Sequence, residues 1–225
     1  MTKSTADTLF LMTGFFVLIA AFIVSALSRE AFFVYFGAED SLVENATAVG
    51  LAIAGIVLMH RVLSKRASLT RAAVVLGVLY GLVYIWVAGE EISWGQRILG
   101  FESPEYFREN NDQQEFTFHN LVIGDVKLDE LIFGPLLSYI ILSYLIILPL
   151  LWPRYDWVQN ITRAMVIPVP RKRHALFALV VTVIIPLLGE SRRWEVYECI
   201  FALLSLAIFV NPVNPIQDVT KRKTA

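Results

Sequence analysis

Runs of apolar residues close to the length of a bilayer-spanning helix dominate the sequence. A helix needs about 20 mostly apolar residues to cross the hydrocarbon core of a membrane. Six stretches come near that length, at approximately residues 9–27, 42–63, 72–88, 131–151, 175–188 and 194–210. Because exposed backbone polar groups are not tolerated in lipid, such runs predict helices. We therefore expect an all-α membrane protein, a six-transmembrane-helix bundle that forms a single domain over residues 1–225.

Composition supports the membrane assignment and excludes some functions. Of the 225 residues, 56% are hydrophobic and 17% are charged, whereas soluble domains average about 45–50% and about 25%. The net charge of −1 argues against a nucleic-acid partner, which would need a clustered basic surface. The single cysteine, Cys199, allows neither an internal disulfide nor a multi-cysteine metal site. Its place in an apolar run favours a buried packing role.

Basic residues between the apolar runs predict the orientation of the bundle. Arginine and lysine gather in loops at 61–71 and 154–173 and in the tail at 221–223. The positive-inside rule assigns such segments to the cytoplasm, so with six spans both termini are cytoplasmic. Residues 89–130 then form a long ordered extracytoplasmic loop between the third and fourth helices. Arg192 and Arg193 break the rule on the outer side, which suggests that they pair with specific acids.

The stretch from Gly89 to Asn120 carries the densest set of chemically active side chains. Glu90 and Glu91 directly follow an apolar run, where a charge is costly unless it has a partner or a function. The topology brings further polar residues to the same end of the bundle. The candidate catalytic residues are Glu90, Glu91, His119 and Arg97, the candidate substrate-binding residues are Glu44, Asn45, Trp94, Gln96, Asn120 and Arg193, and the candidate metal ligands are Glu91, His119 and Glu190.

Three functions are compatible with this pattern. In the first, the polar residues are structural and cap the bundle of an accessory membrane subunit. In the second, they bind or modify a lipid or lipid-linked substrate, either with a divalent metal such as zinc or with Glu91 and His119 as acid and base. In the third, they serve a small cation- or proton-coupled transporter. The spacing matches no established catalytic signature, so the substrate, the reaction and the oligomeric state do not follow from the sequence.

Two geometric expectations concern the same end of the bundle. Glu90 or Glu91, His119 and Glu190 should meet in one pocket, because an isolated charge at the apolar boundary costs about 2–3 kcal/mol. Gly-Glu-x-x-x-Trp occurs at both Gly89 and Gly189, which suggests parallel repeats with matching glutamates.

Several short sequences resemble a group of bacterial multi-pass inner-membrane proteins without an assigned function. The most specific is the GEEISWGQR-type motif at 89–97, and the others are AEDSLVEN at 38–45, ESPE at 102–105 and the pair His119-Asn120. The resemblance covers roughly the first two thirds of the chain. It implies a bacterial cytoplasmic membrane and one compact helical domain, and it implies no reaction or substrate.

Overall fold

The computed structural model describes residues 2–217, and most of them are helical. Within this range, four helical segments are long and apolar enough to cross a membrane. They are α1 (Lys3–Leu27), the segment Arg29–Leu63, α4 (Arg71–Glu91) and the segment Asp129–Leu151. The expectation of a helical membrane protein is therefore supported by four candidate spans.

Two of these segments are built from several helical elements. Arg29–Leu63 contains α2 (Arg29–Phe32), the π-helical η1 (Phe33–Gly37) and α3 (Leu42–Leu63). Asp129–Leu151 contains the π-helical η4 (Asp129–Leu136), α7 (Leu137–Leu142), the π-helical η5 (Ser143–Ile147) and α8 (Leu148–Leu151).

The last two apolar runs also form helices, although neither qualifies as a span on its own. The first gives α10 (Lys172–Ile184), which has 13 residues, followed by the 3₁₀ turn η6 (Ile185–Leu188). The second gives α11 (Arg193–Val210), whose first two turns carry Arg193, Glu195 and Glu198. A six-span bundle therefore remains a proposal.

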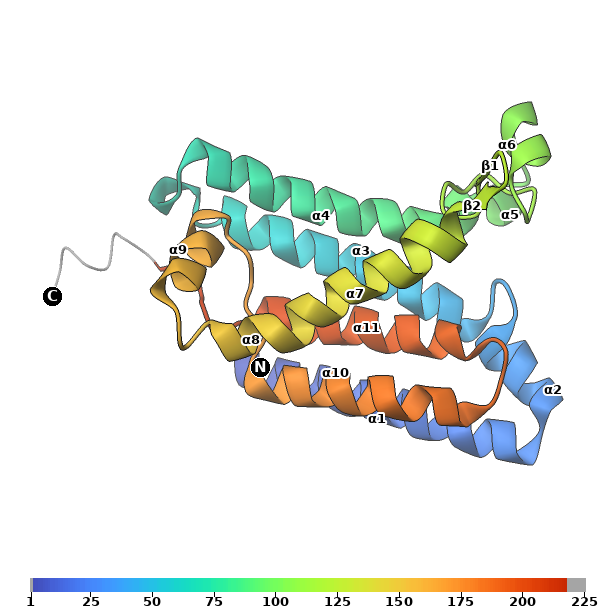
Figure 1. Ribbon diagram of the computed structural model, residues 1–225, viewed down its shortest axis with the longest axis horizontal. Coiled ribbons are helices and arrows are strands. Elements are labelled where there is room, and N and C mark those ends of the chain that lie inside the picture. Colours follow the sequence, from blue (N-terminus) through green and yellow to red (C-terminus); the bar gives the residue numbers. More distant parts are fainter. Residues whose placement is uncertain (1, 218–225) are drawn as a thin grey trace, which may run out of the picture.

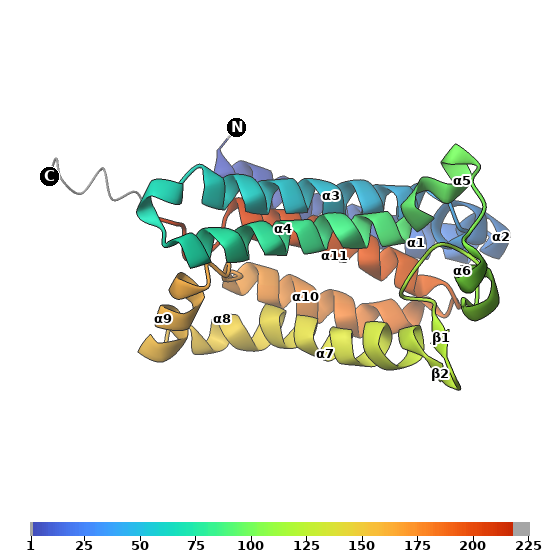
Figure 2. The same ribbon diagram turned by 90° about the horizontal axis from the view of Figure 1, so that it is seen from above.

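The helices lie side by side along one long axis, with short elements gathered at the two ends (Figure 1). The turned view separates α3 and α4 from α10 and α7, with α11 between them (Figure 2). Helix α11 contributes the most buried residues, and Cys199 is among them, as expected. By contrast, large apolar side chains on the outer helices are exposed, such as Phe16 at 70% and Tyr139 at 71%. A bilayer would cover such a surface.

Helices α3 and α4 approach each other closely at two glycines. A Cβ on Gly55 would lie 2.5 Å from the Gly81 carbonyl oxygen, and one on Gly81 would lie 2.7 Å from the Gly55 carbonyl oxygen. Small residues at helix crossings allow this kind of backbone contact in membrane proteins, where packing rather than hydrophobic exclusion drives association.

Gly55→Ala is accordingly expected to destabilise the protein by about 1–3 kcal/mol, the usual cost of overpacking. Thermal unfolding of the detergent-purified variant measures the loss. Ala46→Val adds methyl groups at an exposed position of the same helix and serves as the control. Equal midpoints for the two variants would contradict the close crossing.

Two local features differ from the sequence-based expectation. The segment between the fourth and fifth apolar runs, expected to be a loop, contains α9 (Asp156–Ala164). A two-stranded hairpin, β1 (Val122–Ile123) and β2 (Val126–Lys127), precedes η4, with Gly124 at φ 63° in its turn. The basic tail at 221–223 lies outside the described residues.

A buried polar network holds the end of the bundle where α1 begins. Asp7 and His174 are both fully buried, and the His174 Nε2 atom lies 2.8 Å from Asp7 Oδ1. The Arg171 backbone N–H donates to His174 Nδ1, so Nε2 carries the proton that bonds Asp7. Asn211 and Arg173 also donate to Asp7. This network joins α1, α10 and the end of α11.

Candidate functional site

The backbone turns sharply after α4, within the polar stretch 89–120. Ser93 and Trp94 both adopt positive φ, 48° and 55°, so α4 ends at Glu91 and does not continue toward Arg97. The chain then forms the 3₁₀ turn η3 (Ser93–Gly95), α5 (Gln96–Leu99) and α6 (Glu105–Asn110). These elements and the β1–β2 hairpin lie together at one end of the bundle (Figure 1).

Glu90 anchors this segment to the end of α4. The residue is 4% exposed, and its carboxylate accepts hydrogen bonds from Trp94 Nε1 at 2.8 Å and from the backbone N–H groups of Phe118 and His119 at 2.6 and 3.1 Å. The ring atom His119 Nδ1 lies 3.3 Å from the same carboxylate. Glu90 and His119 therefore lie in contact, as predicted. Both oxygens of the Glu90 carboxylate have partners within this segment.

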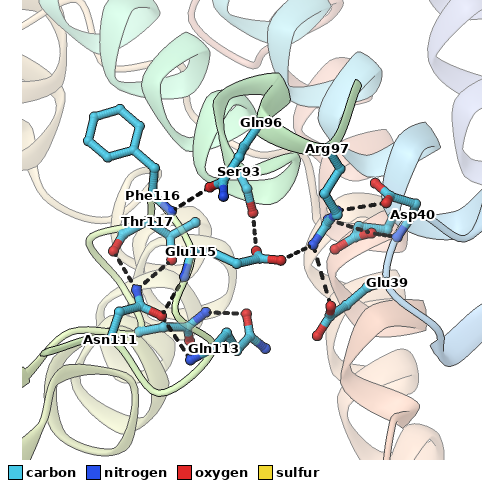
Figure 3. Close-up of polar contacts among 12 residues, drawn as sticks. Glu39, Asp40, Ser93, Gln96, Arg97, Asn111, Gln113, Glu115, Phe116 and Thr117 are labelled. Carbon is cyan, nitrogen blue, oxygen red and sulfur yellow. Dashed lines mark hydrogen bonds and ion pairs between the residues drawn. The ribbon is translucent and has the colours of Figure 1, made fainter. Parts of the chain in front are cut away.

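Arg97 links the segment to the connection that precedes α3. Its guanidinium contacts Glu115 on one side and, on the other, Asp40 at 2.6 Å and Glu39 at 3.4 Å (Figure 3). Ser93 donates to the second oxygen of Glu115. Burial opposes the charged form of Arg97, but Glu115 and Asp40 outweigh it and raise the pKa of the guanidinium above its usual value. Arg97 is thus a permanent cation among acids.

The predicted substrate-binding amides also satisfy internal partners. Gln96 Oε1 accepts from the Phe116 backbone N–H at 2.8 Å and from Ser103 Oγ at 3.0 Å. Asn120 Nδ2 donates to Gln113 Oε1 at 2.7 Å. Asn45 Nδ2 donates to the Asp40 and Ser41 carbonyls, at the start of α3. These amides therefore stabilise the fold through internal hydrogen bonds. Their role in substrate binding remains a prediction.

A second polar group, contributed by three helices, lies next to this segment. It consists of Glu44 on α3, Glu91 on α4, and Glu195 and Glu198 on α11, and we call these four residues the acidic cluster. They are close enough to act on one another electrostatically: Glu91 and Glu198 each interact with the other three members. His119 interacts with Glu91 and Glu195 from the adjoining segment.

Members of the acidic cluster differ in how far they are neutralised. Glu44 lies 3.7 Å from Arg97, and Glu195 lies 3.3 Å from Arg192. Among residues 2–217, the carboxyl groups of Glu91 and Glu198 have neither a hydrogen-bond partner nor an ion-pair partner. Glu198 is exposed and Glu91 is partly exposed, so a ligand could reach the cluster.

Glu190 belongs to a different part of the structure, which corrects the expected ligand set. Its carboxylate accepts from Ser25 Oγ at 2.7 Å and lies 3.8 Å from Arg29 Nε, both next to the end of α1. Arg193 Nη1 donates to the Glu190 carbonyl, and its guanidinium stacks over Trp194. In the described part of the chain, no three His, Cys, Asp or Glu side chains are placed to hold a metal ion, so Glu91, His119 and Glu190 are not gathered as ligands.

The two Gly-Glu-x-x-x-Trp sequences also have different roles. Trp94 donates to Glu90, whereas Trp194 packs edge-on against Tyr197 and under Arg193. Gly189 has φ 73°, while Gly89 lies within α4. Glu90 and Glu190 therefore do not occupy the equivalent positions that the hypothesis of two parallel repeats requires.

Three contributors to the site, Glu115, Glu195 and Glu198, were not among the candidate catalytic, substrate-binding or metal-binding residues. Glu195 and Glu198 carry a usable signal, since they are three residues apart and share a helix face. Glu115 carries none, because only the folded segment brings it to Arg97.

In comparisons with known proteins, no family, no curated protein and no solved structure matches this chain. The function must therefore be inferred from the chemistry of the site. Glu90 and Arg97 already make internal hydrogen bonds and ion pairs, whereas the carboxyl groups of Glu91 and Glu198 have no partner among the described residues. Such a cluster is suited to binding a cationic group or to exchanging protons.

Proposed function

We propose that this protein is an integral membrane protein whose acidic cluster binds the cationic part of a lipid or lipid-linked molecule. The observation that carries the proposal is the pair Glu91 and Glu198, two carboxylates without a partner among the described residues. They adjoin Glu44 and Glu195, each of which has one arginine within 4 Å among residues 2–217. A primary ammonium group, with three N–H donors, can satisfy several such carboxylates at once.

The position of the cluster supports a ligand that enters from the bilayer. Glu91 is the last residue of the candidate span α4, and Glu44, in the first turn of α3, is close enough to act on it electrostatically. The headgroups of lipids lie at this depth. His119, whose side chain is 32% exposed, adjoins the cluster and supplies a group that could exchange a proton with the ligand.

Nanodiscs of defined composition test this proposal. Phosphatidylethanolamine, whose ammonium donates hydrogen bonds, should raise the thermal midpoint above that in phosphatidylcholine, whose quaternary ammonium has no N–H. Glu91→Gln with Glu198→Gln should abolish this difference while preserving the fold, because the substitution also removes like-charge repulsion.

Glu102→Gln, at a position whose side chain is 89% exposed, is the matched control and should keep the full response. A double variant that responds to phosphatidylethanolamine as the unchanged protein does would refute the assignment. Zinc or calcium can be titrated in place of the lipid. A rise of the thermal midpoint with the metal, and none with phosphatidylethanolamine, would indicate a metal site instead of an ammonium site.

The proposal includes a topology of six spans in a bacterial cytoplasmic membrane, with the acidic cluster on the outer side. It rests on the basic loops, on the motif resemblance, and on α10 with η6 running beside α1 and α11 (Figure 1). A cysteine introduced at the exposed Asp112 in a Cys199→Ser background should react with an impermeant maleimide from the outside. Labelling of position 112 only from the cytoplasm would overturn this topology.

A structural role is the second candidate, and a specific observation favours it. Glu90 and Arg97, both predicted to be catalytic, use their polar atoms to fold residues 92–120 onto the bundle. Under this alternative the acidic cluster merely tolerates its charge, and no lipid would change the stability of the protein selectively. Transport is less well supported, because the cluster lies at one end of the bundle rather than near its middle.

A further inference from the structure

A cavity of about 540 Å³ lies at the opposite end of the bundle. It is lined by the last turn of α3 and the connection after it, by α9 and the chain on either side of it, and by the residues that follow α11. Its lining includes Arg61, Arg163, Trp152 and Thr162. Since α3 ends at Leu63 and α8 at Leu151, the cavity sits where two candidate spans end. Ligand sites of about 300–1,000 Å³ are typical of proteins.

The cavity is positively charged. Arg61 donates to the carbonyls of Asn214 at 3.0 Å and Val166 at 3.4 Å, and Arg163 donates to the Gln159 amide oxygen at 3.2 Å. All of these acceptors are neutral, and no Asp or Glu is among the described residues that line the cavity. Two guanidinium charges therefore face one cavity, and none of the described residues that line it is an acid.

Helix α9, which supplies Arg163, has the form of a helix that lies in a membrane surface. Val158 and Thr162 are buried against the protein, and Trp152 Nε1 donates to Thr162 Oγ1 at 3.1 Å. The other apolar side chains, Trp157 at 60% and Ile161 at 47%, are exposed. Tryptophan and aliphatic residues on one face with arginine beside them are typical of interfacial helices.

We propose that this cavity binds the phosphate of an anionic phospholipid, with Arg61 and Arg163 as the ligands of the headgroup. The chemistry that is recognised is a phosphate ester, which a guanidinium binds through paired hydrogen bonds. A lipid is the source rather than a soluble phosphate, because the exposed apolar face of α9 offers the acyl chains a surface beside the cavity. Basic pockets between membrane helices commonly hold such headgroups.

Mass-resolved lipid binding to the full-length protein in detergent tests the proposal, with phosphatidylglycerol compared with phosphatidylcholine. We expect one tightly bound phosphatidylglycerol, and about fivefold weaker binding after Arg163→Gln, the effect of one basic residue on an anionic lipid. Arg163→Lys, which retains the charge, should recover part of the affinity. Arg154→Gln removes an exposed arginine of the same loop that lies outside the cavity and should bind as the unchanged protein does.

Several outcomes would overturn the proposal. Equal loss in Arg154→Gln and Arg163→Gln would mean that general charge attraction, and not the cavity, retains the lipid. Unchanged binding in Arg163→Gln, or no preference for phosphatidylglycerol in the unchanged protein, would remove the site altogether. Displacement of the lipid by millimolar glycerol phosphate would reassign the cavity to a soluble phosphate ester. If Arg163→Gln unfolds at the same midpoint as the unchanged protein but binds the lipid more weakly, the loss of binding is due to lost recognition and not to misfolding.

Discussion

Glu90→Ala is expected to cost about 3–5 kcal/mol of stability and to release residues 92–120 from the end of α4. The substitution leaves the Trp94 indole N–H and the backbone N–H groups of Phe118 and His119 without their acceptor. A buried donor left without a partner costs about 1–3 kcal/mol. Thermal unfolding in detergent measures the loss, and faster amide exchange at Phe118 and His119 locates it.

The neighbouring glutamate provides the control for this experiment. Glu91→Ala removes the same side chain one residue later, but the Glu91 carboxyl group has no hydrogen bond among residues 2–217 and is close to other acids, among them Glu44 and Glu195. We expect Glu91→Ala to leave stability unchanged or to raise it. Glu90→Gln should fall between the two, since the amide retains one acceptor and turns an N–H₂ group toward the donors. Equal losses at positions 90 and 91 would contradict the division of roles between them.

The sequence predicts the long helices well and the turn that ends α4 poorly. The apolar runs at 42–63 and 194–210 coincide closely with α3 and α11, because helix formation in lipid follows directly from hydropathy. The run at 72–88 predicts α4, but its end depends on positive φ at Ser93 and Trp94, which are residues that rarely adopt it. No periodicity marks such a turn.

The candidate site was predictable in part for a similar reason. The cost of a charge at the membrane boundary identifies Glu90, Glu91 and Glu44 as residues that need partners. It does not say which partner each one finds. Glu90 meets His119, as expected, whereas Glu190 turns toward Ser25 on α1. The choice depends on which helix ends adjoin, which is a property of the folded chain.

The same limit applies at the other end of the bundle. The basic residues at 154–173 predict a cytoplasmic loop, yet nine residues of this segment form α9, which helps to enclose a cavity. Proline and arginine in this segment suggest a loop, and tertiary packing of Val158 and Thr162 overrides that tendency.

Arg97→Gln is the second substitution for which we expect a large effect. Arg97 lies within 4 Å of Glu39, Asp40, Glu44 and Glu115, and its side chain is 23% exposed. Without the guanidinium, the four carboxyl groups lose their shared cation; among the described residues, Glu39 alone keeps another arginine within 4 Å, Arg192 at 3.7 Å. Because the Arg97 side chain is only partly exposed, we expect the substitution to cost more than the loss of a surface ion pair and less than the loss of a buried one, about 1–3 kcal/mol of stability. Added salt should recover part of the loss by screening the repulsion.

Arg108→Gln is the matched control, because Arg108 pairs with Glu102 at 3.5 Å in an exposed position and should cost less than about 0.5 kcal/mol. Arg97→Lys keeps the charge without the planar fork and should retain part of the stability. If Arg97→Gln were as stable as Arg108→Gln, Arg97 would not connect residues 92–120 to the start of α3. If it is destabilised but still responds to phosphatidylethanolamine, the stabilising role of Arg97 is separate from ligand binding by Glu91 and Glu198. Loss of both properties in folded protein would instead place Arg97 within the binding site itself.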